Sequence, residues 1–277
     1  FKWNYLTCAS PVFSSIGKAG DGILADGDQI AAIFPGPNGE MYPATGCSVG
    51  AFTAVGQQPT VVGALVSPDA SGAPTGLDIQ MDAETAANVG IQLIPGAGPW
   101  GGGTALTVGT HSGYIDVTFQ TPDWADFDCV TIGWRKVEDF ETGLNAIQAA
   151  GGTGDVAYTD IVGFGAMTPT DLRIQTDLNN SGTSTLTNCG ASVPVNNQNL
   201  RLRCTVAASG LVTYSFVVNA VAGAGTLAAP AATAVFVFDD GDVIVPYIAS
   251  LCAAAAIDIL AIKDIEVQVT PGKSYTN

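Results

Sequence analysis

The sequence predicts an all-β protein, a sandwich of two antiparallel sheets. Short segments rich in β-branched and aromatic residues follow one another from Tyr114 to Val269, and Gly, Asn, Asp and Pro separate them. Plausible helical content is confined to 142–152. Segments of this length and composition, bounded by turn residues, are typical of strands. The predicted strand segments are YIDVTF, DCVTIGW, AYTDIVGF, DLRIQTDL, LRLRCTVA, GLVTYSFVV, AVFVFDDGDVIVPYI and IKDIEVQV.

Turn signals indicate how some of these strands are joined. ASGL at 208–211 predicts a hairpin, and Asp240-Gly241 in FDDGDV predicts another. The stretch LDIQMDAETAANVGIQLIPG, at 77–96, predicts two further strands connected by an acidic turn.

Composition divides the chain into three parts. Residues 1–75 are rich in Gly, Pro and Ala, which defeat long helices, and we expect an extended arm or small β extension laid along a partner. Residues 76–270 form the predicted sandwich, and 271–277 form a C-terminal tail. Because Phe1 is not an initiator residue and FKWNYLTCASPVF has no apolar signal-peptide core, we expect a processed or trimmed start.

The charge balance excludes two classes of partner. Nine basic and 25 acidic residues give a formal net charge of −16, which repels the phosphates of nucleic acids and of anionic membranes. The uncharged run 243–257 contains Pro246 and is too short to span a bilayer. We therefore expect no nucleic-acid or membrane partner.

The density of charge is also low. Charged residues make up 12% of the chain, against roughly 25% in an average soluble domain. A weakly charged surface rich in Ala, Gly and Val suits packing against neighbouring proteins. The alternative is adaptation to salty surroundings, in which acidic residues maintain solubility.

Several stretches between 76 and 269 carry a family resemblance. They are GLDIQMD at 76–82, VTIGWRKVEDF at 130–140, YTDIVGFG at 158–165, IQTDLNNSGTSTLT from Ile174, LRLRCTVAASGLVTYSFVVNA, and FVFDDGDVIVPYI followed by IEVQV. Their order resembles the concanavalin A-like jelly-roll domains of virion proteins from marine tailed phages. The resemblance implies two sheets packed face to face, with end loops and a concave face available to ligands or neighbours. It also implies a capsid, tail or fibre element, with glycan binding in some members.

The sequence does not favour catalysis. Enzymes of this superfold that cleave β-glucans carry E-x-D-x-x-E on a strand, whereas Glu138-Asp139-Phe140-Glu141 has the wrong spacing. Retaining hydrolysis needs two carboxyl groups about 5–5.5 Å apart. The single histidine, His111, has no nucleophile elbow near it. We expect a protein that is not an enzyme.

One acidic loop is a candidate metal site. Asp123, Asp126 and Asp128 in PDWADFD supply the oxygen ligands that calcium prefers. The alternative is a solvated acidic turn, since the spacing matches no known calcium loop. The legume-lectin metal motif is missing, and no other cofactor is indicated.

Aromatic residues are candidates for glycan binding. Trp124, Trp134, Tyr158 and Tyr214 could stack on sugar rings, and Trp124 is favoured because it lies in a polar loop. The alternative is that these rings belong to the core, as most strand aromatics do.

Arginine, lysine and cysteine give structural expectations. Arg135-Lys136 is expected to form surface or inter-subunit ion pairs. The six cysteines have no C-x-x-C or metal-ligand spacing, and Cys129 and Cys204 are expected to be buried in strands.

Three functions remain, in order of preference. The first is a non-enzymatic virion protein (capsid, decoration, tail or fibre element) in an extracellular particle, with copies of itself and other virion proteins as partners. The second is a carbohydrate-binding, lectin-like module that recognises a host or matrix polysaccharide. The third is a polysaccharide-cleaving enzyme.

Overall fold

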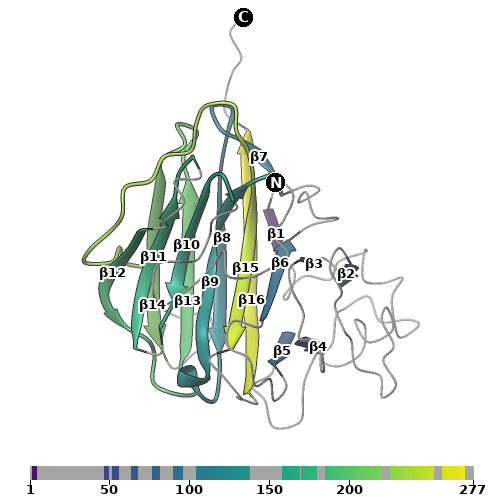
Figure 1. Cartoon of the computed structure of the whole chain (residues 1–277), viewed down its shortest axis with the longest axis vertical. Helices are drawn as coiled ribbons and strands as arrows, with labels where there is room; N and C mark the ends of the chain where they lie inside the picture. The colour runs from purple at the N-terminus through teal and green to yellow at the C-terminus, as the bar shows by residue number, and fades with distance from the viewer. Residues whose placement is uncertain are drawn as a thin grey trace, which may run out of the picture.

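The computed structural model shows a sandwich of two antiparallel β-sheets stacked face to face, which confirms the predicted fold class (Figure 1). It describes residues 2–4, 47–49, 52–55, 64–67, 77–81, 90–95, 104–137, 158–168, 170–179, 185–219, 225–252 and 258–271. Within these ranges helix is confined to one 3₁₀ turn, η1 (Trp124–Asp126), and no helix is long and apolar enough to cross a membrane.

The seven-stranded sheet consists, in spatial order, of β14 (Val212–Asn219), β13 (Asn199–Val206), β8 (His111–Gln120), β16 (Asp258–Pro271), β5 (Leu77–Met81) and β4 (Ala64–Ser67), with β1 (Lys2–Asn4) beside β16. The nine-stranded sheet consists of β12 (Thr185–Ser192), β11 (Asp171–Asp177), β10 (Ile161–Ala166), β9 (Phe127–Lys136), β15 (Val243–Cys252), β6 (Gly90–Pro95), β3 (Phe52–Val55) and β2 (Cys47–Val49), with β7 (Leu106–Thr107) beside β15. Strands β14 and β12 therefore form the same lateral edge of the sandwich (Figure 1).

Alternation along the central strands explains how the sheets meet. In β8 the side chains of Ile115, Val117 and Phe119 are fully buried, and in β13 those of Leu200 and Leu202 are too. The register pairs Leu202 with Val117, so these apolar residues share one face. Each such burial contributes about 1.5–3 kcal/mol. The nine-stranded sheet contributes Val130, Ile132, Trp134, Val162 and Phe164 to the same core.

Both predicted turns are present. Between β13 and β14, the N–H of Ala207 donates to the carbonyl of Leu211, and Gly210 adopts φ +83°. At 239–242 the N–H of Asp242 donates to Asp239, and Gly241 adopts φ +88°. Glycine suits both positions because positive φ strains residues that carry a Cβ.

The sequence predicts a strand before Gly241, but the structure does not form one there. Residues 225–238, which we call the strap, run along the lateral edge formed by β14 and β12 (Figure 1). Phe236 accepts a backbone hydrogen bond from Val212 on β14, whereas Ala232 donates to Cys189 on β12. Because the strap bonds to both sheets in turn, it has no continuous strand partner and joins neither sheet.

The N-terminal strands pair with the sandwich. β1 pairs with β16, β3 with β6, and β4 with β5. The predicted strands β5 and β6 are both present, and they belong to different sheets. The predicted helical stretch 142–152 lies outside the described residues, as do Glu138, Asp139 and Glu141. The domain boundary at residue 75 stays a prediction.

Candidate functional site

Strand β11 carries a strip of polar side chains on the outer face of the nine-stranded sheet. Its sequence, DLRIQTD, alternates, so Leu172 and Ile174 are buried in the core between the sheets. The intervening residues Asp171, Arg173, Gln175 and Asp177 lie on the opposite face, because successive strand side chains alternate. We call these four residues the β11 strip.

Exposure differs along this strip. Gln175 and Asp177 are buried, at 0% and 2% exposure. The side chains of Asp171 and Arg173 are 32% and 27% exposed, and they form an ion pair of 3.5 Å between Oδ2 and Nη2. The first half of β11 is therefore the part that a ligand in solution can reach.

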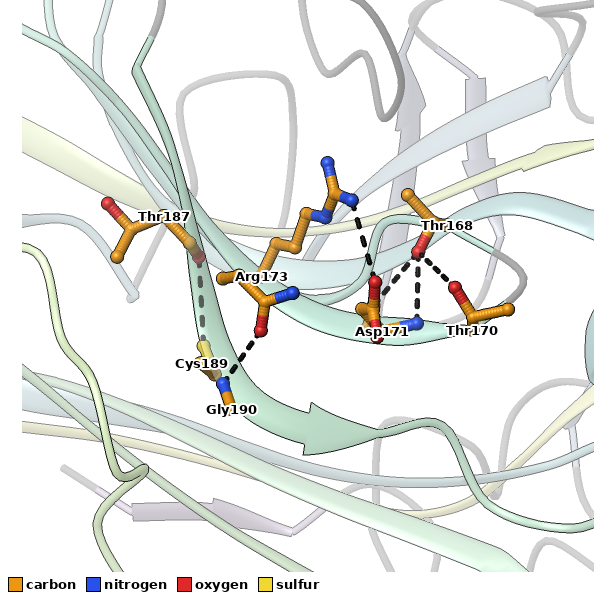
Figure 2. A network of polar contacts seen from close by, with 8 residues as sticks. Thr168, Thr170, Asp171, Arg173, Thr187, Cys189 and Gly190 are labelled. Atoms are coloured by element: carbon orange, nitrogen blue, oxygen red, sulfur yellow. Dashed lines mark hydrogen bonds and ion pairs between the residues drawn. The ribbon is translucent and has the colours of Figure 1, made fainter.

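Backbone contacts hold this accessible half in place. The hydroxyl of Thr168 accepts a hydrogen bond of 2.9 Å from the N–H of Asp171 and lies 3.5 Å from the hydroxyl of Thr170 (Figure 2). On β12, Asn188 is the register partner of Arg173 and is exposed. Its Oδ1 accepts from the N–H of Gly190 at 2.7 Å. We call Asp171, Arg173 and Asn188 the rim.

A bulge shapes the neighbouring edge strand. The register between β11 and β12 shifts between Asp171 and Arg173, and Gly190 adopts φ +71° at this point. Cys189 faces the core by the ordinary alternation of the strand, and burial raises the pKa of its thiol to about 12. Asn188, which precedes it, lies on the outer face beside Arg173.

Beside the strip, glycines leave room for one tyrosine. Gly163 pairs with Gln175 on one side and with Gly133 on the other. A Cβ at Gly163 would lie 2.7 Å from the hydroxyl oxygen of Tyr247. The Tyr247 hydroxyl donates to the carbonyl of Val162 at 3.1 Å. The place beside Gly163 is therefore filled by a side chain of the protein, whereas the rim residues are accessible to solvent.

Lys136 forms ion pairs as predicted, whereas the surface position predicted for Arg135 is wrong. Arg135 is fully buried, with its guanidinium 4.7 Å from the ring centre of Tyr158. The Nζ of Lys136 lies 2.7 Å from Asp242 and 3.6 Å from Asp160. Arg135 lies on the outer face of a central strand rather than at the surface, because β10 and β15 flank β9 on both sides.

The Lys136 ion pairs bring together two carboxylates that are distant in sequence. Burial raises the pKa of Asp160, and the hydrogen bond with Asp242 raises the pKa of Lys136. The oxygen of Asp160 also accepts from the N–H of Asn179 at 2.8 Å. A lysine therefore occupies the space between these carboxylates, which is where a glycosidase holds its substrate.

The aromatic residues predicted to bind sugar are buried. Trp124 and Trp134 are 2% and 0% exposed, and the indole N–H of Trp134 donates to the carbonyl of Cys204 at 3.1 Å. Tyr158 and Tyr214 are buried too. Trp124, Trp134 and Tyr214 belong to the core between the sheets, whereas Tyr158 is buried on the outer face against Arg135. Large rings gain from burial in either place, so none of the four offers a face to a sugar.

The predicted metal ligands are only partly described. The carboxylate of Asp123 caps η1 by accepting a 2.9 Å hydrogen bond from the N–H of Ala125. The side chains of Asp126 and Asp128 lie outside the described set. Within that set, no three His, Cys, Asp or Glu side chains are grouped to hold a metal ion. The calcium site stays a prediction.

A second charged cluster lies on the outer face of the seven-stranded sheet. Asp116 is 4% exposed and accepts hydrogen bonds from Arg201 at 2.9 and 3.0 Å and from Arg203 at 2.7 Å. The guanidinium of Arg203 lies 4.3 Å from the ring centre of Tyr114, whose hydroxyl donates to Glu266. Burial is the main cause that raises the pKa of Tyr114 to about 12. These mutually paired groups stabilise the sheet.

Comparison with known proteins identifies the fold. No protein-family model and no curated protein matches the chain. Among solved structures, it is similar to peanut lectin with a nine-residue peptide, at 12% identity and a TM-score of 0.50, over 83% of this chain and 97% of the lectin. Lectin I from Ulex europaeus, in complex with the methyl glycoside of α-L-fucose, is 11% identical over 79% and 98%, with a TM-score of 0.49. The chain has the concanavalin A-like jelly-roll fold that the sequence resemblance implies.

Proposed function

We propose that this chain is a carbohydrate-binding, lectin-like module and that the rim residues Asp171, Arg173 and Asn188 contact the sugar. One observation carries the proposal: neighbouring strands place a carboxylate, a guanidinium and an amide together on an accessible part of the outer face. Sugar hydroxyls both donate and accept hydrogen bonds, and this set supplies acceptors and donors together. The fold shared with peanut lectin supports a role of this kind.

The charges favour a neutral glycan. Asp171 and Arg173 neutralise one another at the rim, whereas the whole chain carries −16. A polysaccharide with sulfate or uronate groups would be repelled by this field. We expect the rim to prefer hexoses without ionised groups.

A glycan array followed by titration calorimetry tests this function. Asp171→Asn and Arg173→Met each remove one charged group that is proposed to hydrogen-bond the sugar. Each is expected to weaken glycan binding at least about tenfold, since hydrogen bonds to charged groups contribute roughly 1.5–3 kcal/mol. Asp239→Asn is the matched control, because Asp239 is an exposed carboxylate in the turn at 239–242. The proposal fails if no glycan binds, or if the rim variants bind as tightly as the control.

A structural role in a virion is the second candidate. It is supported by the low fraction of charged residues, 12%, and by aliphatic side chains exposed along the strap. In this role the chain would have copies of itself and other virion proteins as partners. It would be located in an extracellular particle of phage type. Electron microscopy of the native source tests it directly: a symmetric particle that contains the chain supports the role, and its absence from all particles contradicts it.

A further inference from the structure

Exposed aliphatic side chains gather around the strap. Of the seven large hydrophobic residues that are exposed in the described part of the chain, Leu178, Leu211, Val235 and Val237 lie here. Val235 is 84% exposed, while its neighbours Phe236 and Phe238 are buried and pack edge to face at 4.8 Å. A gathering of exposed aliphatic groups on one edge marks a site of interaction.

The strap edge has a ridge with a groove on each side. One groove, of about 390 Å³, is lined by Leu178, by the polar residues Thr176, Asp177 and Thr185, and by 235–237. The other, of about 250 Å³, is lined by 211–214, Ala229 and 233–235. Val235 belongs to both linings and therefore forms the ridge between the two grooves.

The charge distribution points to the kind of partner. The strap contains no charged residue, whereas the whole chain carries −16. Two copies of the chain repel one another wherever acidic surfaces approach, and this repulsion is weakest at an uncharged edge. Asp177 is the charged residue that lines these grooves, and it is 2% exposed.

From this shape and charge we infer that the strap edge is the contact between two copies of this chain, with the Val235 ridge of each copy in a groove of the other. A two-fold interface requires a self-complementary surface, and a ridge beside a groove meets that requirement. The contact is separate from the rim and does not depend on glycan binding.

Sedimentation equilibrium of the full chain, over a range of concentrations, tests the inference. The wild type is expected to show a reversible monomer–dimer equilibrium. Val235→Asp is expected to raise the dissociation constant at least about tenfold, because it places a carboxylate in an apolar contact. Val195→Asp is the matched control, with the same change of charge at a valine that is 70% exposed and lines neither groove. It should dimerise like the wild type.

Two outcomes would overturn the inference. The first is a wild type that stays monomeric, including one whose grooves bind the neutral dye N-phenyl-1-naphthylamine instead of a second copy. The second is an equal effect of Val235→Asp and Val195→Asp. Circular dichroism and thermal melting of both variants show whether the fold is intact. Unchanged glycan binding by Val235→Asp would separate this contact from the proposed sugar site.

Discussion

The hydroxyl of Tyr247 lies directly against the backbone of Gly163, at a place where an alanine methyl would approach the phenol oxygen to 2.7 Å. The two residues come from β15 and β10, which are separated by β9 in the nine-stranded sheet. The glycine is required there because the tyrosine covers it, and the tyrosine is held by its hydrogen bond to Val162. This pair determines which part of the outer face is filled.

We expect Gly163→Ala to lower the free energy of unfolding by about 1–3 kcal/mol, the range for forcing an extra methyl into a packed site. Tyr247→Phe should lower it by about 0.5–1.5 kcal/mol through loss of one hydrogen bond. Because Tyr247→Phe removes the atom that the new methyl would meet, the double variant should be less destabilised than the sum of the two. Urea unfolding of all four proteins measures this coupling, and strict additivity would show that the contact is unimportant.

The strands could be predicted from the sequence more completely than the site could. Alternation of apolar and polar residues is local information, so LRLRCTV predicts β13. In the same way, Asp240-Gly241 predicts the turn at 239–242. Residues 234–238 alternate in the same way, yet Phe236 and Phe238 of the strap are buried without a continuous strand partner. Whether an alternating segment joins a sheet depends on long-range pairing, which the segment itself does not encode.

The candidate site illustrates the same limit. Polar residues surround Trp124 in the sequence and favour a surface position, but its ring is buried in the core. The rim needs the register between Arg173 and Asn188, which lie on different strands. The available signal was the alternation DLRIQTD, whose polar positions define a strip on one face. Which part of that strip is exposed follows only from the packed structure.

The Lys136 ion pairs make a prediction about alkaline pH. The folded protein raises the pKa of Lys136 above its ordinary value of 10.5, so the protonated form is stabilised by folding. This stabilisation is complete below the pKa of the unfolded chain and is lost as the pH rises through the higher folded pKa. Lys136→Gln should therefore be less stable than the wild type at pH 8, by about 1 kcal/mol, as for a strong surface pair.

Urea unfolding at intervals from pH 8 to pH 11.5 measures this difference. The difference in free energy of unfolding between the wild type and Lys136→Gln should be constant up to about pH 10 and should narrow above it. Tyr114 also favours its protonated form, but it is present in both proteins, so its effect cancels in the difference. A gap that stays constant to pH 11.5 would show that the ion pairs contribute nothing.

Removal of divalent cations should leave glycan binding unchanged. The rim contains its own carboxylate, guanidinium and amide, and the carboxylate of Asp123 is engaged with the N–H of Ala125. Calorimetric titration of the array's best glycan before and after dialysis against EDTA measures this, with calcium added back as the control. A loss of affinity that calcium restores, and that Asp126→Asn or Asp128→Asn abolishes, would establish the acidic loop as a calcium site.

The last prediction is that the chain has no hydrolytic turnover on polysaccharides. Asp160 and Asp242 are brought together by the fold, but Lys136 lies within 3.6 Å of the first and 2.7 Å of the second. Glycoside hydrolysis needs a carboxyl group on either side of the sugar, and the side chain of Lys136 occupies the space between Asp160 and Asp242. His111 is engaged as well, since its Nδ1 accepts from the N–H of Thr107 at 3.1 Å. Incubation with β-glucans and with algal and bacterial polysaccharides, followed by measurement of reducing sugar, checks the prediction. Release of oligosaccharides that disappears in Asp160→Asn, but persists in the exposed control Asp239→Asn, would establish the chain as a hydrolase.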